Sequence, residues 1–181
     1  MYPDGVVSQH INNLAIGDTL EVKHIKFNVK LPYPFGKKTI SMISGGTGIT
    51  PMYQALQKLL TVEGDTTEIT LLYGNASVSD ILLKKELDVL AANSGGRLKI
   101  VYVVGTAQDQ APIDGWDGEL GWVDKAKVEK HCYPPSPDTM VFVCGLPAMY
   151  NSMCGPRGEK ELAEGSVLPA LGYTQDMVAK F

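Results

Sequence analysis

The feature that most constrains this chain is an apolar, β-branched run at residues 39–44 that stops abruptly at the glycine-rich residues 45–48. A helical pattern of apolar residues follows and starts at Pro51. Thr50 suits the N-cap of that helix, and Pro51 suits its first position, where a missing N–H has no cost. In such a strand, glycine turn and helix, backbone N–H groups are open to a phosphate. The sequence therefore predicts an anion site here, with a plain tight turn as the alternative.

Strand and helix patterns alternate along the chain from residue 38 onward. Strands that are apolar on both faces and separated by helices form parallel sheets with helices on each side. The sequence therefore predicts an α/β fold with a doubly wound parallel sheet. Strands are predicted at 39–44, 68–74, 97–104 and 139–144, and helices at 51–62, 80–92, 124–131, 147–154 and 161–171.

Residues 1–37 have a different pattern. Residues 6–14 suit one or two helical turns, and residues 19–25 alternate with a period of two, which is typical of a half-buried antiparallel strand. One strand alone does not form a sheet, because its edges are left unpaired. We therefore interpret residues 1–37 as the C-terminal part of an antiparallel β domain, followed by an α/β domain at residues 38–181.

A second glycine loop, Cys-Gly-Leu-Pro-Ala-Met, follows the fourth predicted strand at residues 144–149. Parallel sheets bind ligands beyond the carboxyl ends of their strands, at the point where the strand order reverses. If the strand at 139–144 lies beside that at 39–44, the two glycine loops face each other there. One loop would hold phosphates while the other closes over a base or ring. The loops together predict a dinucleotide site, although the first has the spacing G-x-G-x-x-P and not G-x-G-x-x-G.

Composition and charge argue against several other functions. The net charge is −4 and the 16 lysines and arginines are scattered, so we expect no nucleic-acid partner. No apolar run approaches the roughly 20 residues that span a bilayer. The 3 cysteines lack C-x-x-C spacing, so we expect neither a zinc site nor an iron–sulfur site. Their odd number favours a reduced, intracellular protein.

The two glycine loops, Gly45–Met52 and Cys144–Met149, resemble those of the ferredoxin-reductase-like flavoenzymes, and within them the NADH–cytochrome b5 reductase family. Residues 2–9 are similar to the flavin-pyrophosphate segment of that family, and residues 75–83 to its second βα unit. The sequence ends on an aromatic residue, Phe181, as family members tend to. The resemblance implies an N-terminal FAD barrel, of which this chain carries only the last part, and a C-terminal NADH-binding domain of the ferredoxin-reductase type.

The resemblance also implies an activity, which is flavin-dependent electron transfer from NADH to a haem protein such as cytochrome b5. The cofactors would be FAD and NADH, and this chain would carry the NADH-binding part. By the same resemblance we expect a cytoplasmic protein, with any attachment to the endoplasmic reticulum or mitochondrial outer membrane made by a segment absent from this chain. Two alternatives stay open: a dinucleotide-binding module without redox activity, and another reductase of the superfamily, such as a nitrate-reductase-like enzyme.

Several residues depart from the family pattern. The flavin motif Arg-x-Tyr-(Ser/Thr) is absent, which indicates that most of the FAD barrel is missing from this chain. Asp4 stands where the family has glycine, and Leu146 and Ala148 replace prolines of Cys-Gly-Pro-Pro-Pro-Met. Residues 104–112 replace the family's shorter Thr-Leu-Asp-x-x-Pro, so the choice between NADH and NADPH stays open at this point.

The resemblance implies roles for individual residues. Thr50 would lie near the flavin ring, and the alternative is a helix cap alone. Cys144 would lie against the nicotinamide as a small, polarizable side chain, and the alternative is a buried core cysteine. The FAD pyrophosphate would contact Gly5, Val7 and Ser8, although Ser8 also suits a helix cap. The NADH contacts would be Gly45, Gly46, Thr47, Gly48, Thr50, Pro51, Gly145, Leu146, Pro147 and Met149.

The loop at residues 105–120 is long and rich in Gly, Asp and Pro, which makes it a functional candidate. By the resemblance, the adenosine ribose lies near this loop, which carries acidic residues and neither Lys nor Arg. Such a loop repels the 2′-phosphate of NADPH, so we predict NADH with Asp109 on the ribose. The alternative is that these acids cap turns while a lysine outside the loop binds the phosphate. The candidate lysines are Lys84, Lys85 and Lys125. The two tryptophans at this loop, Trp116 and Trp122, would pack either in the core or against the nucleotide.

Overall fold

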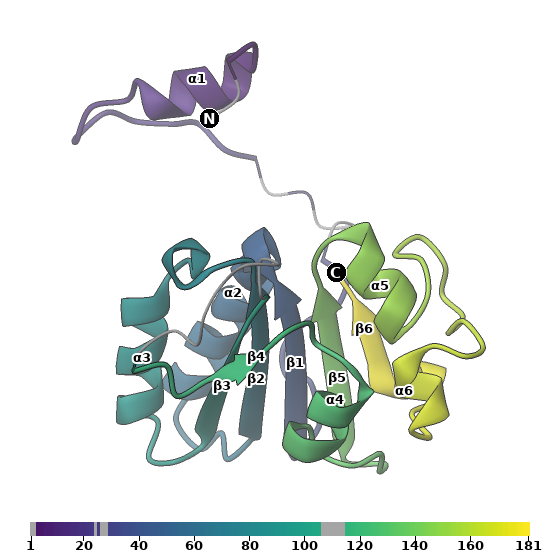
Figure 1. Ribbon diagram of the computed structural model, residues 1–181. Helices are drawn as coiled ribbons and strands as arrows, with labels where there is room; N and C mark the ends of the chain where they lie inside the picture. Colours follow the sequence, from purple (N-terminus) through teal and green to yellow (C-terminus); the bar gives the residue numbers. More distant parts are fainter. Residues whose placement is uncertain (1–2, 24, 26–28, 106–114) are drawn as a thin grey trace. The chain divides into compact units, whose positions relative to one another are not determined.

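The computed structural model describes residues 3–23, 25, 29–105 and 115–181. The chain divides into two compact units, Met1–Pro32 and Tyr33–Phe181 (Figure 1). The first unit contains helix α1 (Val6–Asn12), as predicted.

The strand predicted at residues 19–25 does not form at the described residues of that range. A strand needs a partner to pair its backbone groups, and no other described residue of the first unit is in a strand. The prediction is therefore wrong for residues 19–23 and 25.

The second unit is built on a six-stranded sheet in the order β4-β3-β2-β1-β5-β6 (Figure 1). Every neighbouring pair of strands is parallel, so the predicted α/β fold with a parallel sheet is confirmed. The two edge strands, β4 and β6, were not predicted because they are too short to show a pattern. The strands are β1 (Thr39–Gly45), β2 (Glu68–Asn75), β3 (Leu98–Val104), β4 (Glu119–Leu120), β5 (Thr139–Cys144) and β6 (Val178–Lys180).

Two predicted helices are shorter than expected. The helix predicted at 80–92 begins only at Lys84, because Leu83 takes a left-handed conformation with φ 58°. The helix predicted at 161–171 begins after Gly165, whose φ of 81° breaks it. The α-helices are α2 (Ile49–Thr61), α3 (Lys84–Asn93), α4 (Lys125–His131), α5 (Pro147–Met153) and α6 (Val167–Ala170), and the 3-10 helices are η2 (Gly46–Gly48), η3 (Val78–Asp80) and η4 (Gln175–Met177).

Helices cover both faces of the sheet (Figure 1). On one face, strand residues such as Ile43, Leu72 and Val143 pack against α4, α5 and α6. Helix α2 contacts β1 and β5 from the other face, and α3 contacts β3. Because successive strand residues point to opposite faces, Met42 and Phe142 belong to the α2 face. Both of these side chains are fully buried, so the core has two layers that are separated by the sheet.

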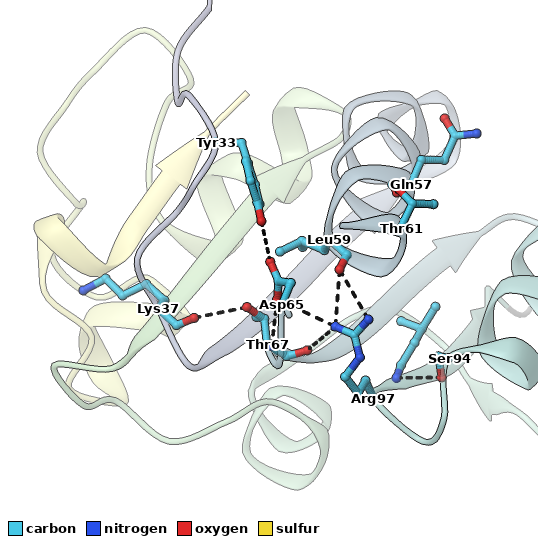
Figure 2. A network of polar contacts seen from close by, with 10 residues as sticks. Tyr33, Lys37, Gln57, Leu59, Thr61, Asp65, Thr67, Ser94 and Arg97 are labelled. Carbon is cyan, nitrogen blue, oxygen red and sulfur yellow. Dashed lines mark hydrogen bonds and ion pairs between the residues drawn. The ribbon is translucent and has the colours of Figure 1, made fainter. Parts of the chain in front are cut away.

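A polar network at the amino ends of the strands centres on Asp65, in the loop between α2 and β2 (Figure 2). The Tyr33 hydroxyl donates to one carboxylate oxygen of Asp65 at 2.9 Å, and the Thr67 backbone N–H donates to the other at 2.8 Å. The Arg97 guanidinium lies 3.7 Å from the same carboxylate. Although burial pushes the pKa of Asp65 up, the bonds from Thr67 and Tyr33 and the charge of Arg97 hold it below the ordinary value.

Arg97 joins this network to the C-terminal end of α2 (Figure 2). Its guanidinium donates to the Leu59 carbonyl at 3.3 and 3.4 Å and to the Thr67 carbonyl at 3.4 Å. A cation near the last turn of a helix satisfies open carbonyls and interacts favourably with the helix dipole. The network therefore fixes the end of α2 that is remote from the glycine turn.

Candidate functional site

The point where the strand order reverses lies at β1, which has β2 on one side and β5 on the other. The pairing aligns Ser44 with Cys144, so the two glycine loops leave the sheet side by side. The condition under which the two glycine loops were expected to face each other, β5 lying beside β1, is therefore met. In parallel α/β sheets, the carboxyl edge at such a point is where ligands bind.

The first glycine turn is itself helical. Residues 46–48 form the 3-10 helix η2, which runs directly into α2 at Ile49. Thr50 is therefore inside the helix, and its hydroxyl donates to the Thr47 carbonyl at 3.1 Å. The predictions of Thr50 as N-cap and Pro51 as first helical residue are wrong, because the turn already supplies the first helical geometry. The N-cap is Gly48, which has no side chain to cap with.

Three glycines of the two loops lie close to neighbouring atoms, and Gly48 is the most tightly enclosed. A Cβ on Gly48 would lie 2.2 Å from the Cys144 carbonyl oxygen and 2.9 Å from the Gly145 nitrogen. A Cβ on Gly145 would lie 2.7 Å from the Met149 sulfur, and one on Gly45 would lie 2.8 Å from the Met149 methyl carbon. Gly48 therefore admits no side chain unless backbone moves, whereas at Gly45 and Gly145 the closest atoms belong to the flexible end of the Met149 side chain. Close contact between the two loops is thus a second reason for glycine at Gly48, besides access for a ligand.

Gly46 is different from its neighbours. Its φ is 52°, and a Cβ there would meet nothing within 4 Å. The Tyr73 hydroxyl donates to the Gly46 carbonyl at 3.0 Å, and the Tyr73 side chain is fully buried, which raises its pKa. Tyr73 stands opposite Ser44 in the β1–β2 pairing, so it supports the turn from the neighbouring strand. Sequence reasoning missed Tyr73; a polar-tipped aromatic at the end of an apolar strand was the available signal.

The outer surface of the two loops is open to solvent. Thr47 and Thr50 are exposed on the first loop, and Leu146 is 68% exposed on the second. Cys144 is half-buried, so the alternative of a fully buried core cysteine does not describe it. The remaining predicted site residues of these loops are half-buried (Pro51, Gly145, Met149) or exposed (Pro147).

The acidic loop is only partly described. Asp109, the predicted ribose ligand, lies outside the described residues. Glu119, on β4, accepts from Lys130 at 2.6 Å and pairs with His131 at 2.7 Å. Hydrogen bonds from Lys130 and His131 lower the pKa of Glu119 to about 2. The Glu119 carboxylate therefore binds two side chains of α4, and it attaches the end of the loop to that helix.

Lys84, one of the three lysines considered as phosphate ligands, has other partners in the structure. The Lys84 ammonium lies 2.8 Å from the Asp88 carboxylate and 4.6 Å from the centre of the Tyr102 ring. These contacts argue against Lys84 as a ligand for the 2′-phosphate of NADPH. The other two candidates, Lys85 and Lys125, are exposed.

The two tryptophans differ in environment. Trp116 is half-buried, and its indole N–H donates to the Glu119 carbonyl at 3.3 Å. Trp122 is 81% exposed just beyond the carboxyl end of β4, so core packing is wrong for this residue. An exposed indole at this edge of the sheet offers a flat apolar surface to a ligand.

The predicted FAD contacts lie in the first unit. Gly5 is the N-cap of α1, and the Ser8 hydroxyl donates to its carbonyl at 3.0 Å. Val7 is 71% exposed. Ser8 therefore lies inside the first turn of α1 and does not cap it, so the capping alternative is wrong.

No group of three or more His, Cys, Asp and Glu side chains among the described residues is arranged to hold a metal ion. No helix in the described part of the chain is long and apolar enough to cross a membrane.

Comparison with known proteins agrees with this geometry. Residues 42–155 match the family of oxidoreductase NAD-binding domains. An NADH-cytochrome b5 reductase-like protein of Arabidopsis thaliana is 43% identical over 100% of this chain, which covers 54% of that protein. NADH-cytochrome b5 reductase 2 of Lodderomyces elongisporus is 39% identical over 99% of the chain, which covers 59% of that protein.

A solved structure is similar as well. The cytochrome b5 reductase domain of Ulva prolifera nitrate reductase aligns with a TM-score of 0.70 and 37% identity, over 81% of this chain and 58% of that one. The fold and the paired glycine loops thus define an NAD-binding α/β domain. The chain belongs to the oxidoreductase NAD-binding domain family, as the NAD-binding domain of the cytochrome b5 reductase family. It spans somewhat more than half the length of these relatives.

Proposed function

We propose that this chain is the NADH-binding part of an FAD-dependent oxidoreductase that passes electrons from NADH to a haem protein such as cytochrome b5. The observation that carries the proposal is the direct contact of two glycine loops at the carboxyl ends of β1 and β5. The domain match over residues 42–155 supports it. We assign the unit Met1–Pro32 to the end of the FAD domain and the unit Tyr33–Phe181 to the NADH domain, which moves the expected boundary between residues 37 and 38 five residues earlier.

The first loop is suited to a pyrophosphate. It precedes α2, a helix of 13 residues whose N-terminal dipole favours an anion. Thr47 is exposed there, and the space beside the Gly46 α-carbon is open. Backbone N–H groups of residues 46–48 would hold the phosphates of NADH, while Tyr73 keeps the Gly46 carbonyl turned away from them.

The second loop is suited to the nicotinamide end of the same ligand. Cys144 is half-buried beside the exposed Leu146, so its small, polarizable thiol would form one wall for the ring. We assign Cys144 to positioning and not to covalent chemistry. Thr50, one loop away, would lie near the flavin ring. Bound FAD would supply the redox chemistry, by taking a hydride from NADH and passing electrons on singly.

We propose NADH and not NADPH as the donor. The described acidic residues of the loop, Asp117 and Glu119, bring no positive charge to a 2′-phosphate, and Lys84 is engaged elsewhere. Asp109 would bind the ribose, and Trp122 would stack on the adenine. The test is the ratio of kcat/KM for NADH and NADPH in the complete enzyme and in its Asp109→Ala variant. A wild-type preference for NADPH would refute the assignment, and an unchanged ratio in the variant would clear Asp109 alone.

The acceptor and the redox role need a separate experiment. Reduction of cytochrome b5 and of ferricyanide by NADH should both be seen with the complete enzyme. The similarity to the reductase domain of a nitrate reductase favours the same electron transfer inside a larger enzyme as the second candidate. The other alternative is an NADH-binding module without redox activity. NADH binding by calorimetry without any flavin spectrum in the complete protein would favour that module.

A further inference from the structure

The hydroxyl of Tyr150 lies at a junction that the proposed NADH contacts do not explain. Tyr150 is in α5, directly after the second glycine loop, and its side chain is 3% exposed. Its backbone N–H donates to the Leu146 carbonyl at 3.2 Å, which places it one turn into the helix. Its hydroxyl donates to the carbonyl oxygen of Phe181. The side chain therefore joins α5 to the segment that follows β6.

Phe181 is held beside the end of β5 by two other contacts. Its backbone N–H donates to the Val143 carbonyl at 3.0 Å, which continues the β5–β6 pairing. Its ring packs edge-on against Phe142 at 5.1 Å between centroids. Lys180 fixes the preceding position, because its ammonium donates to the carbonyls of Pro156, Glu159 and Glu161. The Phe181 carbonyl therefore lies close to the start of the second glycine loop.

The electrostatics of Tyr150 agree with this position. Burial raises the pKa of Tyr150, and so does a hydrogen bond with the Cys144 thiol. The backbone of Gly145 and the charge of Arg157 act in the opposite direction. The buried Tyr150 hydroxyl thus bonds to Phe181 and lies near the half-buried Cys144 and Gly145.

We infer that Tyr150 is a positioning residue, whose hydroxyl ties Phe181 to the second glycine loop and so fixes the Cys144 thiol where the nicotinamide would bind. The inference rests on the proposed function, because it assumes that Cys144 faces the nicotinamide. Without the hydroxyl, the loop would keep its apolar packing and lose the bond that sets its distance from β6. A small displacement of a reacting ring lowers the rate of reaction more than it weakens binding.

Tyr173 provides a matched control. It is 4% exposed, it packs in the same core cluster, and its hydroxyl also donates to a backbone carbonyl, that of Tyr133. It touches neither glycine loop through that bond. Tyr150→Phe and Tyr173→Phe each remove one buried hydroxyl, so they should lower the melting temperature by similar amounts.

The experiment measures flavin reduction by NADH in the complete enzyme with FAD bound, by stopped-flow spectroscopy. For Tyr150→Phe we expect the rate at saturating NADH to fall about tenfold, with the NADH Kd changed less than about twofold. For Tyr173→Phe we expect the wild-type rate. An active wild type with an equally active Tyr150→Phe, or an equal loss in both variants, would overturn the role of Tyr150 alone. A wild type that does not reduce flavin with NADH would overturn the proposed function itself.

Should Tyr150→Phe not fold, hydrogen exchange in the wild-type enzyme decides the question. Binding of NAD⁺ should slow exchange at residues 144–150, and through Tyr150 it should also slow exchange at residues 178–181. Protection of the first segment without the second would contradict the inference.

Discussion

The two ends of the sheet are stabilised in different ways. At the amino ends of the strands, side chains form the contacts, since Asp65 takes bonds from Tyr33 and an ion pair from Arg97. At the carboxyl ends, backbone meets backbone, since Gly48 lies directly against the Cys144 carbonyl. The difference suits a division of labour in which one end fixes the strands and the other leaves backbone N–H groups near the surface for a ligand.

Two serines of β1 show the same contrast on a smaller scale. Ser41 accepts the Tyr133 backbone N–H at 2.9 Å, whereas the buried Ser44 hydroxyl, at the carboxyl end, has no hydrogen-bond partner in the described part of the chain. A buried polar group without a partner costs free energy. The carboxyl end therefore gives up some stability, as binding edges commonly do.

The largest expected effect is that of Gly48→Ala. Its new Cβ would meet the Cys144 carbonyl oxygen at 2.2 Å, so the backbone of one loop must move. We expect the free energy of unfolding to fall by about 3 kcal/mol, as for severe overpacking. Urea unfolding followed by circular dichroism measures it.

Gly46→Ala is the control for this change. Its Cβ meets nothing, so only the left-handed φ of 52° opposes the substitution, at about 1 kcal/mol. Equal losses for the two variants would show that loop contact is not what requires glycine at Gly48.

The second prediction tests the amino end. Asp65→Asn keeps the shape of the side chain and leaves Arg97 without its anion, so unfolding stability should fall by about 2 kcal/mol at pH 7. Asp138→Asn is the matched control, because its ion pair with Lys38 is exposed and screened by solvent, so a much smaller loss of stability is expected. If both variants lose the same small amount, the network around Asp65 is not important for stability.

The stability lost in Asp65→Asn should also depend on pH. The pKa of Asp65 is depressed in the folded protein, so its contribution is fully present above the ordinary value of 3.8 and is lost as the pH falls through the folded value. The difference in unfolding free energy between wild type and Asp65→Asn should therefore be constant from pH 7 to 5 and shrink below about pH 4. A difference that grows on acidification would contradict the depressed pKa.

The third prediction concerns Tyr73, which supports the glycine turn from β2. Tyr73→Phe leaves the Gly46 carbonyl without its donor, so we expect a loss of about 1 kcal/mol in stability. NADH binding should weaken about fivefold, because the turn is less well held. Tyr102→Phe is the control, since its hydroxyl donates to Asp88 on α3 at 2.7 Å and does not touch the turn. Isothermal calorimetry with NADH should separate them, and equal affinities would show that Tyr73 only stabilises the core.

The long strands and the place of the site were predictable from the sequence. Strands of 6 and 8 residues, such as β5 and β2, could be recognised because both of their faces are buried and most of their residues are therefore apolar. The glycine loops could be predicted because each directly follows one of these apolar strands. The strand predicted at residues 19–25 failed for the opposite reason, since its pattern describes a surface that needs a partner strand.

The contacts that shape the site were not predictable. Gly48 and Cys144 are far apart in the sequence, and only the β1–β5 pairing brings them together. The same holds for Tyr73 under the turn and for Tyr150 at Phe181, which are tertiary hydrogen bonds without a local pattern. The short edge strand β4 was hidden in a loop, although it places Glu119.

The smallest expected effect is that of Glu119→Gln, which tests whether ion pairs also stabilise the fold at the carboxyl ends of the strands. Glu119 holds Lys130 and His131, but its side chain is 26% exposed, against 9% for Asp65, so solvent screens it more. We expect a loss of about 0.5–1 kcal/mol at pH 7.

Because the pKa of Glu119 falls from 4.5 to about 2, its contribution to stability is fully present above pH 4.5 and is lost between there and pH 2. Unfolding by urea at pH 7, 5 and 3 should therefore show equal differences at the first two and a smaller one at the third. Glu129→Gln, an exposed change on α4, the helix that carries Lys130 and His131, should show none. A loss as large as that of Asp65→Asn would mean that the two ends of the sheet are held alike.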